Sequence, residues 1–199
     1  LVHFFQSDYT RDYLRHSGSL RYHPLSDYTD PDFIHQSQIA SENPPIAGRP
    51  NKICFFPNKG ADRAASFLQG RALRPDIEFV PIRDMTKKQV RKTLFDARLY
   101  IDFGHHPGKD RVPREAAIAG AILLLHAAGA ATYFLDHPLP PEYLFTEEDI
   151  TSGALHQKVE TILENPTPHH ANQRLYRDTI LLERDRFDLE VRQFFFTGA

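Results

Sequence analysis

Short apolar runs alternate with stretches of helical spacing in the middle of the chain. Four of these runs carry few polar positions, as expected for strands that are buried on both faces. The four runs span residues 53–56, 77–82, 99–103 and 122–125, and a fifth strand is expected at 131–135. Because helical patterns separate the runs, the sequence predicts an α/β fold with a Rossmann-like parallel sheet flanked by helices.

The helices expected around this sheet carry start and stop signals. Ser7 is a candidate N-cap for a helix that Gly18 ends. Between the strands, helices are expected at residues 64–68, 86–97 and 114–119, with Gly120 closing the last of them. The motif Thr146-Glu147-Glu148-Asp149 resembles a capping box for a helix that ends near Leu163.

The last third of the chain is expected to be helical. Asn165-Pro166-Thr167-Pro168 predicts a break, after which one long final helix carries an apolar stripe. The stripe consists of Tyr176, Ile180, Phe187, Val191 and Phe194. Two further phenylalanines follow it, so this Phe-rich end needs cover from another part of the protein or from a second copy of the chain.

Composition divides the chain into parts. Residues 35–50 are rich in Gln, Ser, Asn and Pro, which is typical of a linker. The chain begins at Leu1 inside an apolar run, which indicates a piece of a longer protein. We therefore expect a first segment at 1–34, a linker at 35–50, a sheet domain at 51–165 and a C-terminal helix at 166–199.

The overall composition excludes several classes of protein. The 199 residues include 24 Lys plus Arg and 26 Asp plus Glu, a net charge of −2 that argues against a general nucleic-acid binder. A hydrophobic content of 41% is too high for a disordered chain. Cys54 is the one cysteine, which excludes a disulfide framework and indicates a reducing cytoplasm. No apolar run approaches the length of a membrane-spanning helix.

The segment from Tyr100 to Ala117 carries most of the candidate chemistry. A strand leads into a basic, glycine-containing loop and then into a helix, the place where open α/β sheets bind ligands. Unpaired N–H groups at a helix start suit a phosphate. The candidate binding residues here are Gly104, His105, His106, Gly108, Lys109 and Arg111, with Arg114 as a further cation and Glu115 as an acceptor for ribose hydroxyls. The competing interpretation is an ordinary loop in which Asp110 caps the helix and Arg114 and Glu115 are solvated.

A second turn of the same kind contains Lys59 and Gly60 after the first strand. Lys59 could reach a diphosphate, and Gly60 would let the backbone approach a ligand closely. The chain lacks the P-loop pattern, the dinucleotide Gly-x-Gly-x-x-Gly pattern and the hydrolase Gly-x-Ser-x-Gly elbow. His105 and His106 are adjacent, so on an extended chain they point in opposite directions and form a poor chelating pair. The sequence therefore predicts no metal and no cofactor.

These two segments resemble the C-terminal, donor-binding domain of retaining GT-B-fold glycosyltransferases, and a bacterial group among them. Pro57-Asn58-Lys59-Gly60 is similar to the lysine-glycine donor loop of that family. Glu115 matches the second of two family glutamates spaced eight apart, which implies that it binds the donor ribose. Pro107 stands where the first glutamate would be. The resemblance places Arg111 and the loop 104–108 beside the donor sugar and diphosphate.

The resemblance implies transfer of a glycosyl group from a nucleotide-diphosphate sugar to an unidentified carbohydrate or lipid-linked acceptor. Cations would take the place of a metal at the leaving diphosphate. It also implies that residues 1–34 are the tail of a truncated N-terminal domain, to which the last helix crosses back. Bacterial polysaccharide synthesis is the expected setting, and no residue is assigned as catalytic.

Two alternatives stay open. The first is a nucleotide- or sugar-phosphate-binding module that has lost transfer, which Pro107 favours. The second is a sugar-nucleotide epimerase of the same fold, for which Asp102 and Asp110 are the nearby carboxylates.

Overall fold

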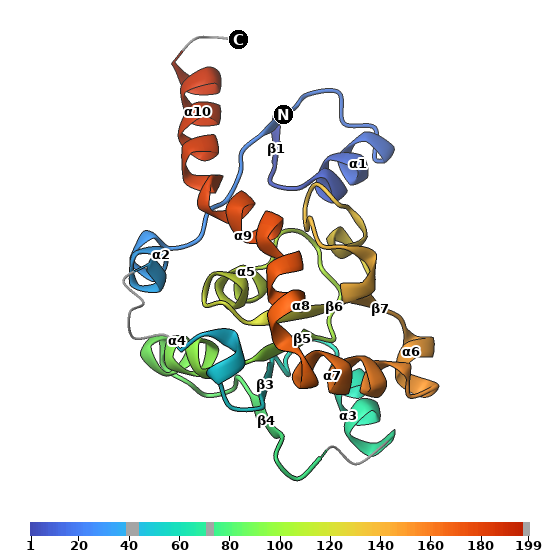
Figure 1. The fold of residues 1–199 in the computed structure, drawn as a ribbon. Coiled ribbons are helices and arrows are strands. Elements are labelled where there is room, and N and C mark those ends of the chain that lie inside the picture. The colour runs from blue at the N-terminus through green and yellow to red at the C-terminus, as the bar shows by residue number, and fades with distance from the viewer. Residues whose placement is uncertain (39–43, 71–73, 197–199) are drawn as a thin grey trace.

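A parallel five-stranded sheet forms the centre of the computed structural model, which describes residues 1–38, 44–70 and 74–196 (Figure 1). The strand order is β4-β3-β5-β6-β7, and every neighbouring pair is parallel. The strands are β3 (Lys52–Phe55), β4 (Glu78–Pro81), β5 (Leu99–Asp102), β6 (Ile122–His126) and β7 (Leu144–Phe145). The fold class and the first four predicted strands are confirmed.

The predicted fifth strand at 131–135 is wrong. Residues Ala130–Thr132 form a 3-10 helix, η2, and a second 3-10 helix, η3 (Pro141–Tyr143), leads into β7. The alanines and aromatic residues that suggested a strand lie in the loop between β6 and η3. Gly129, with φ at 61°, turns the backbone away from the strand direction directly after β6, because this conformation does not continue a β ladder.

Three helices connect the strands: α3 (Ala61–Gly70), α4 (Lys87–Asp96) and α5 (Arg111–Ile118). Thr86 caps α4 as part of a capping box with Gln89. The helix expected at 114–119 begins three residues earlier, at Arg111. β5 and β6 are buried along their whole length, so the continuous apolar runs reflect cover on both faces of the sheet.

The C-terminal third is helical but more broken than predicted. It contains α6 (Glu147–Thr151), α7 (Ala154–Glu164), α8 (Pro166–Asn172), α9 (Arg174–Leu181) and α10 (Glu183–Phe195). The capping box at Thr146 is confirmed, but Gly153, with φ at 81°, ends that helix early. Pro166 starts α8 at a position where its missing N–H costs nothing. Within the described ranges, no helix is long and apolar enough to cross a bilayer.

The single long final helix is therefore wrong, and Gln173 gives a physical reason for one of its breaks. The Gln173 amide both accepts a hydrogen bond from the Leu123 N–H and donates one to the Leu123 carbonyl, each at 2.9 Å. β7 is short and pairs only with Leu125 and His126 of β6. The backbone groups of Leu123 therefore bind the Gln173 side chain on that side. Buried backbone groups need partners, and Gln173 serves here as a strand would.

The first 38 residues form a separate layer. β1 (His3–Phe5) and β2 (Tyr22–Pro24) make a parallel two-stranded sheet, joined by α1 (Asp8–His16) and followed by α2 (Pro31–Gln38). Ser7 caps α1 as predicted, accepting from the Thr10 N–H at 3.1 Å. Of the expected linker, residues 35–38 belong to α2 and Ile46–Gly48 form a 3-10 helix, η1. Residues 39–43 of the expected linker lie outside the described ranges.

The C-terminal helix α10 packs against this first segment (Figure 1). The ring of Phe194 meets Phe4 of β1 edge-on at 4.8 Å, and Tyr28 meets Phe187 at 5.0 Å. Phe195 and Phe196 stay exposed. A two-stranded sheet is marginal alone, so this apolar cover from α10 helps to hold β1 and β2 in place.

Candidate functional site

The loop after β5 is held by Asp102, at the carboxyl end of that strand. Its Oδ1 accepts the Gly104 N–H at 2.8 Å, and its Oδ2 accepts the Tyr100 hydroxyl at 2.9 Å. Asp102 is buried, and both of its carboxylate oxygens are hydrogen-bonded to its own strand and loop. Its role is to shape the loop, which leaves it a poor acid or base for substrate chemistry.

Asp110 joins the two segments that the sequence singled out. Lys59 Nζ lies 2.9 Å from Asp110 Oδ1, and His106 Nδ1 lies 3.1 Å from Oδ2. Asp110 is the N-cap residue of α5, as in the ordinary-loop interpretation, but its side chain makes no capping hydrogen bond. Burial alone would raise the pKa of Asp110, but the hydrogen bonds from His106 and Lys59 hold that pKa below its ordinary value.

Gly60 lets its backbone come close to another part of the protein, and not to a ligand. Gly60 has φ at 71°, and a Cβ there would collide with the Phe103 carbonyl of the neighbouring loop. Glycine is therefore required for the turn after β3 to pack against the loop after β5. Gly104 is equally crowded, because a Cβ on it would lie 2.7 Å from Lys59 Cβ.

The two adjacent histidines have different environments. His106 is fully buried, so it cannot donate directly to a bound molecule as expected. His105 is exposed, and its ring meets Tyr9 of α1 edge-on at 5.9 Å. Behind His106 lies His137, whose pKa burial lowers to about 3, so that imidazole is neutral at physiological pH. His105 is therefore the member of the pair that a ligand can reach.

Arg111 and Glu115 lie on one side of α5 and line a groove. Two adjoining hollows of about 140 and 300 Å³ share Arg111, Met85 and Val90. One hollow includes Glu115 with Asp30, which precedes α2, and Phe33 of α2. The other includes Asn58, Arg83 and Asp84 in the loops that follow β3 and β4. This groove lies at the carboxyl edge of the sheet, as predicted for a ligand site.

Glu115 is only slightly exposed within this groove. Burial raises the pKa of its carboxyl, and the nearby Arg111, with Nε 3.5 Å from Oε1, opposes that rise. The expectation that Glu115 is solvated in the ordinary-loop interpretation is therefore wrong. A half-enclosed carboxylate beside a guanidinium can accept hydroxyl hydrogen bonds while the guanidinium binds an anionic group.

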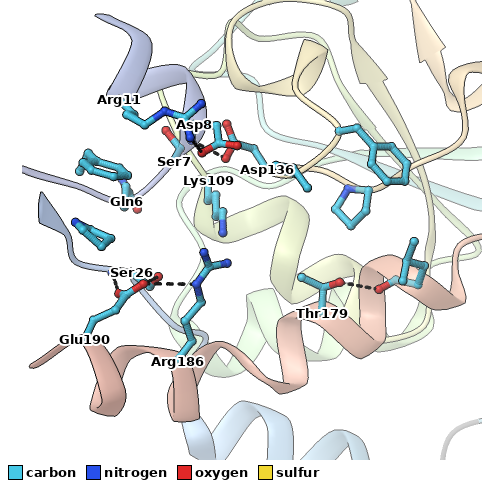
Figure 2. Close-up of a pocket in the computed structure, with 16 residues that line it drawn as sticks. Gln6, Ser7, Asp8, Arg11, Ser26, Lys109, Asp136, Thr179, Arg186 and Glu190 are labelled. Carbon is cyan, nitrogen blue, oxygen red and sulfur yellow. Dashed lines mark hydrogen bonds and ion pairs between the residues drawn. The ribbon is translucent and has the colours of Figure 1, made fainter. Parts of the chain in front are cut away.

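Arg114 and Lys109 do not join this groove. Arg114 is 1% exposed and donates to Glu183 at 2.9 Å and to Asp27 at 2.6 Å, so it is a structural cation and no phosphate ligand. Lys109 lines a different cavity, on the side of α1 and α10 (Figure 2). Gly108 contacts the Gln6 side chain there. The predicted site residues thus separate into a groove, a partly buried bridge from Lys59 through Asp110 to His106, the exposed His105, and a second cavity.

The sequence missed two features of this region. Asp110, considered as a helix cap and as a candidate carboxylate for an epimerase, is the residue that links Lys59 to His106. Asp30, just before α2, and Phe33 of α2 line the hollow with Glu115 and carry no motif that would reveal them. Within the described portion of the chain, no group of three or more His, Cys, Asp or Glu side chains could hold a metal ion.

The parallel sheet and the groove at its carboxyl edge define a Rossmann-like domain. The fold is similar to sucrose-phosphate synthase from Thermosynechococcus elongatus, with a TM-score of 0.65 and 17% identity, covering 96% of this chain and 57% of that one. It is also similar to HepE from Anabaena in complex with UDP-glucose, with a TM-score of 0.57 and 14% identity, covering 94% of this chain and 59% of that one.

These likenesses establish the fold. The chain spans less than three fifths of the length of either structure. No family model matches the sequence, and no curated protein matches it. The GT-B resemblance of the sequence and the likeness of the fold thus agree.

Acid should weaken the fold through Asp110. Its pKa is lower in the folded state than in the unfolded chain, where it is about 3.9. Its ion pair therefore stabilises the protein above about pH 4, and that contribution is lost as the pH falls through the folded-state pKa. Asp110→Asn should unfold with a shallower pH dependence between about pH 2 and 5, measured by urea unfolding. An unchanged dependence would contradict the assignment, and the exposed Asp62→Asn serves as control.

Proposed function

We propose that this chain forms the donor-binding part of a glycosyltransferase that takes a glycosyl group from a nucleotide-diphosphate sugar. The observation that carries the proposal is the pairing of Glu115 and Arg111 in a groove at the carboxyl edge of a GT-B-type sheet. The likeness of the fold to HepE, a structure in complex with UDP-glucose, supports this ligand class.

In this proposal Glu115 accepts hydrogen bonds from the ribose hydroxyls and Arg111 pairs with the diphosphate. Lys59 and His105, on the adjoining loops, face the sugar end of the donor. The charge that develops on the departing diphosphate is then stabilised by side-chain cations without a metal. The acceptor would be a carbohydrate or a lipid-linked sugar, and bacterial polysaccharide synthesis in the cytoplasm is the setting that the sequence resemblance supports.

The second candidate function is binding of a nucleotide or sugar phosphate without glycosyl transfer. Two observations favour it: Pro107 stands in place of the family's first glutamate, and Lys59 is already paired with Asp110 at 2.9 Å. An epimerase has less support, since Asp102 and Asp110 would have to act as acid and base. Both carboxylates are hydrogen-bonded within the loops.

Thermal unfolding in the presence of UDP, GDP, dTDP, ADP and CDP tests the shared binding step. A nucleotide at about 100 times its Kd should add roughly 2.7 kcal/mol. For a chain of this length that is a rise in Tm of about 5–10 °C. One nucleotide should raise Tm more than the others, and no rise with any of them would contradict both functions.

Turnover separates the two functions. The chain is incubated with the sugar conjugate of the nucleotide that binds, and release of the free nucleoside diphosphate is followed over time. Release above the spontaneous rate supports the transferase, and binding without release supports the module.

A further inference from the structure

A cavity of about 410 Å³, lined in part by Lys109, shares none of the lining residues of the groove. It is enclosed by the β1–α1 junction, by the loop at 134–138 and by α9 and α10 (Figure 2). Its volume falls in the range of small-molecule sites, which is about 300–1,000 Å³. Nothing in the proposed donor site accounts for it.

Lys109 is the central charge of this cavity. The residue is 6% exposed, and its ammonium points into the cavity toward the guanidinium of Arg186 on α10 (Figure 2). Among the described residues, Lys109 has no hydrogen-bond or ion-pair partner. A nearly buried ammonium without a partner is costly, so this position calls for a negative charge.

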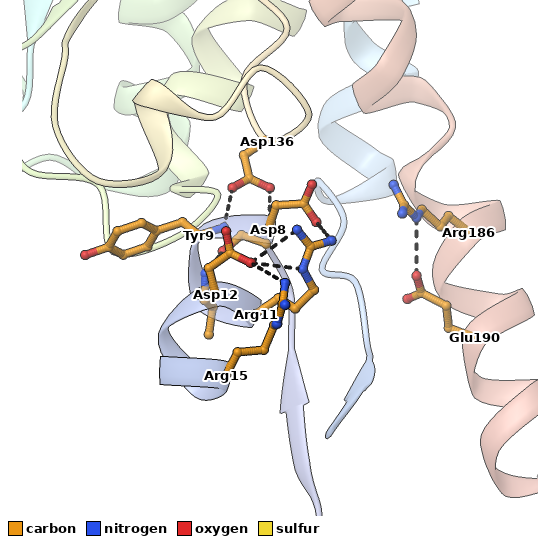
Figure 3. Close-up of polar contacts among 10 residues, drawn as sticks. Asp8, Tyr9, Arg11, Asp12, Arg15, Asp136, Arg186 and Glu190 are labelled. Carbon is orange, nitrogen blue, oxygen red and sulfur yellow. Dashed lines mark hydrogen bonds and ion pairs between the residues drawn. The ribbon is translucent and has the colours of Figure 1, made fainter. Parts of the chain in front are cut away.

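The carboxylates that line the cavity are already engaged. Asp136 accepts the N–H groups of Asp8 and Tyr9 at the start of α1, at 2.7 and 3.0 Å (Figure 3). Asp8 is paired with Arg11 at 2.8 Å. Lys109 is close enough to Asp136, and to Glu183 of α10, to favour their ionised forms, but neither carboxylate forms a hydrogen bond or an ion pair with it.

Glu190 is engaged in the same way. It accepts the Ser26 N–H at 2.5 Å and the Ser26 hydroxyl at 3.0 Å (Figure 2). It also accepts a hydrogen bond from Arg186 Nε at 3.2 Å (Figure 3). Only Nε of Arg186 is used in that contact, so its two terminal nitrogens are left for another acceptor. Two cations thus present unused donors to one cavity.

We propose that this cavity binds the oxyanion of a second small-molecule ligand, a phosphate group held between Lys109 and Arg186. The ammonium and the guanidinium supply charge-assisted donors from opposite walls, and the anion relieves the repulsion between them. If the chain is a glycosyltransferase, the ligand is a phosphorylated acceptor; that assignment rests on the proposed function, whereas anion binding does not.

Calorimetric titration with inorganic phosphate tests the site on the whole chain. Lys109→Gln and Arg186→Gln should each raise the Kd for phosphate about 10-fold or more, the loss expected for a charge-assisted hydrogen bond. The matched control is Arg174→Gln, which removes one positive charge from α9 at a position outside the cavity. The Kd of Arg174→Gln for phosphate should differ from that of the wild type by less than about 2-fold.

Three further ligands identify the chemistry. Glucose 6-phosphate should bind at least as tightly as inorganic phosphate, and glucose should not bind. Tighter binding of glucuronate than of glucose 6-phosphate would overturn the assignment to phosphate. Arg186 is exposed, so Arg186→Gln remains informative even where Lys109→Gln lowers the stability of the buried loop.

Several results would overturn the proposal. They are the absence of saturable phosphate binding, an unchanged affinity in Arg186→Gln, or displacement of phosphate by UDP with no effect of the cavity variants. The last result would place the phosphate in the donor groove. A UDP titration of the same samples reports on the donor groove separately, so failure of one site is distinguishable from failure of the other.

Discussion

Replacing Glu115 with glutamine is expected to remove most of the stabilisation that a nucleotide gives this protein. The substitution keeps the size of the side chain but removes the charge that accepts two ribose hydroxyls. A hydrogen bond to a charged group contributes about 1.5–3 kcal/mol, and glutamine keeps one acceptor oxygen. A loss equivalent to one such bond should lower the affinity about 10- to 100-fold. At a fixed nucleotide concentration, a rise in Tm of about 5–10 °C should shrink to a few degrees or less.

The pH dependence of binding gives a second measure of the same residue. The pKa of Glu115 is raised by burial, so the ionised form is lost at a higher pH than for an exposed glutamate. Nucleotide affinity should therefore fall as the pH drops through that pKa, and Glu115→Gln should remove this dependence. The control is Glu148→Gln, an exposed carboxylate on α6 far along the chain from the groove. Equal nucleotide stabilisation of wild type and Glu115→Gln would contradict the ribose assignment.

Replacing Arg114 with methionine is expected to be the most destabilising of these changes. Arg114 is 1% exposed and joins α5 to Glu183 of α10 and to Asp27 after β2. Removing one member of a buried ion pair leaves the other charge unpaired, which costs about 3–5 kcal/mol. Urea unfolding should show that loss, equivalent to a fall in Tm of roughly 6–20 °C.

A double-mutant cycle distinguishes lost pairing from lost packing. Arg114→Met with Glu183→Leu removes both buried charges, so the double variant should be more stable than the sum of the single losses predicts. The exposed pair of Arg174 and Asp178 is the control, because exposed pairs contribute about 0–1 kcal/mol. Additive losses at Arg114 and Glu183 would show that the pair contributes through packing alone.

The Arg114 contact also relates the two candidate sites. Arg111 and Glu115 face the groove from the helix that Arg114 anchors to α10, and α10 carries Arg186 of the cavity. Asp27 belongs to the segment that leads from β2 to α2, and Asp30 of that segment and Phe33 of α2 line the groove. Buried Arg114 thus connects helix α5 to α10 and to the segment before α2, which carry residues of the two sites.

Local pattern in the sequence determined much of the sheet. The predictions of β5 and β6 are correct because strands buried on both faces must be continuously apolar, whatever their neighbours are. β4, at the edge of the sheet, is predicted by its apolar run although it is not buried. The caps at Ser7 and Thr146 are correct because a cap involves residues three positions apart. The GT-B resemblance rests on the same kind of short motif around Lys59 and Glu115.

The tertiary structure decided which side chains share a site. Asp110 and Lys59 meet across 51 positions, and Arg114 and Glu183 across 69, distances over which the sequence pattern carries no signal. The break at Gln173 depends on an unpaired stretch of β6 beside it. Lys109 and Arg111 are two residues apart and line different hollows, because the loop ends and the helix begins between them. Spacing along the chain determines periodic burial, whereas the direction of a loop side chain depends on the elements that pack around it.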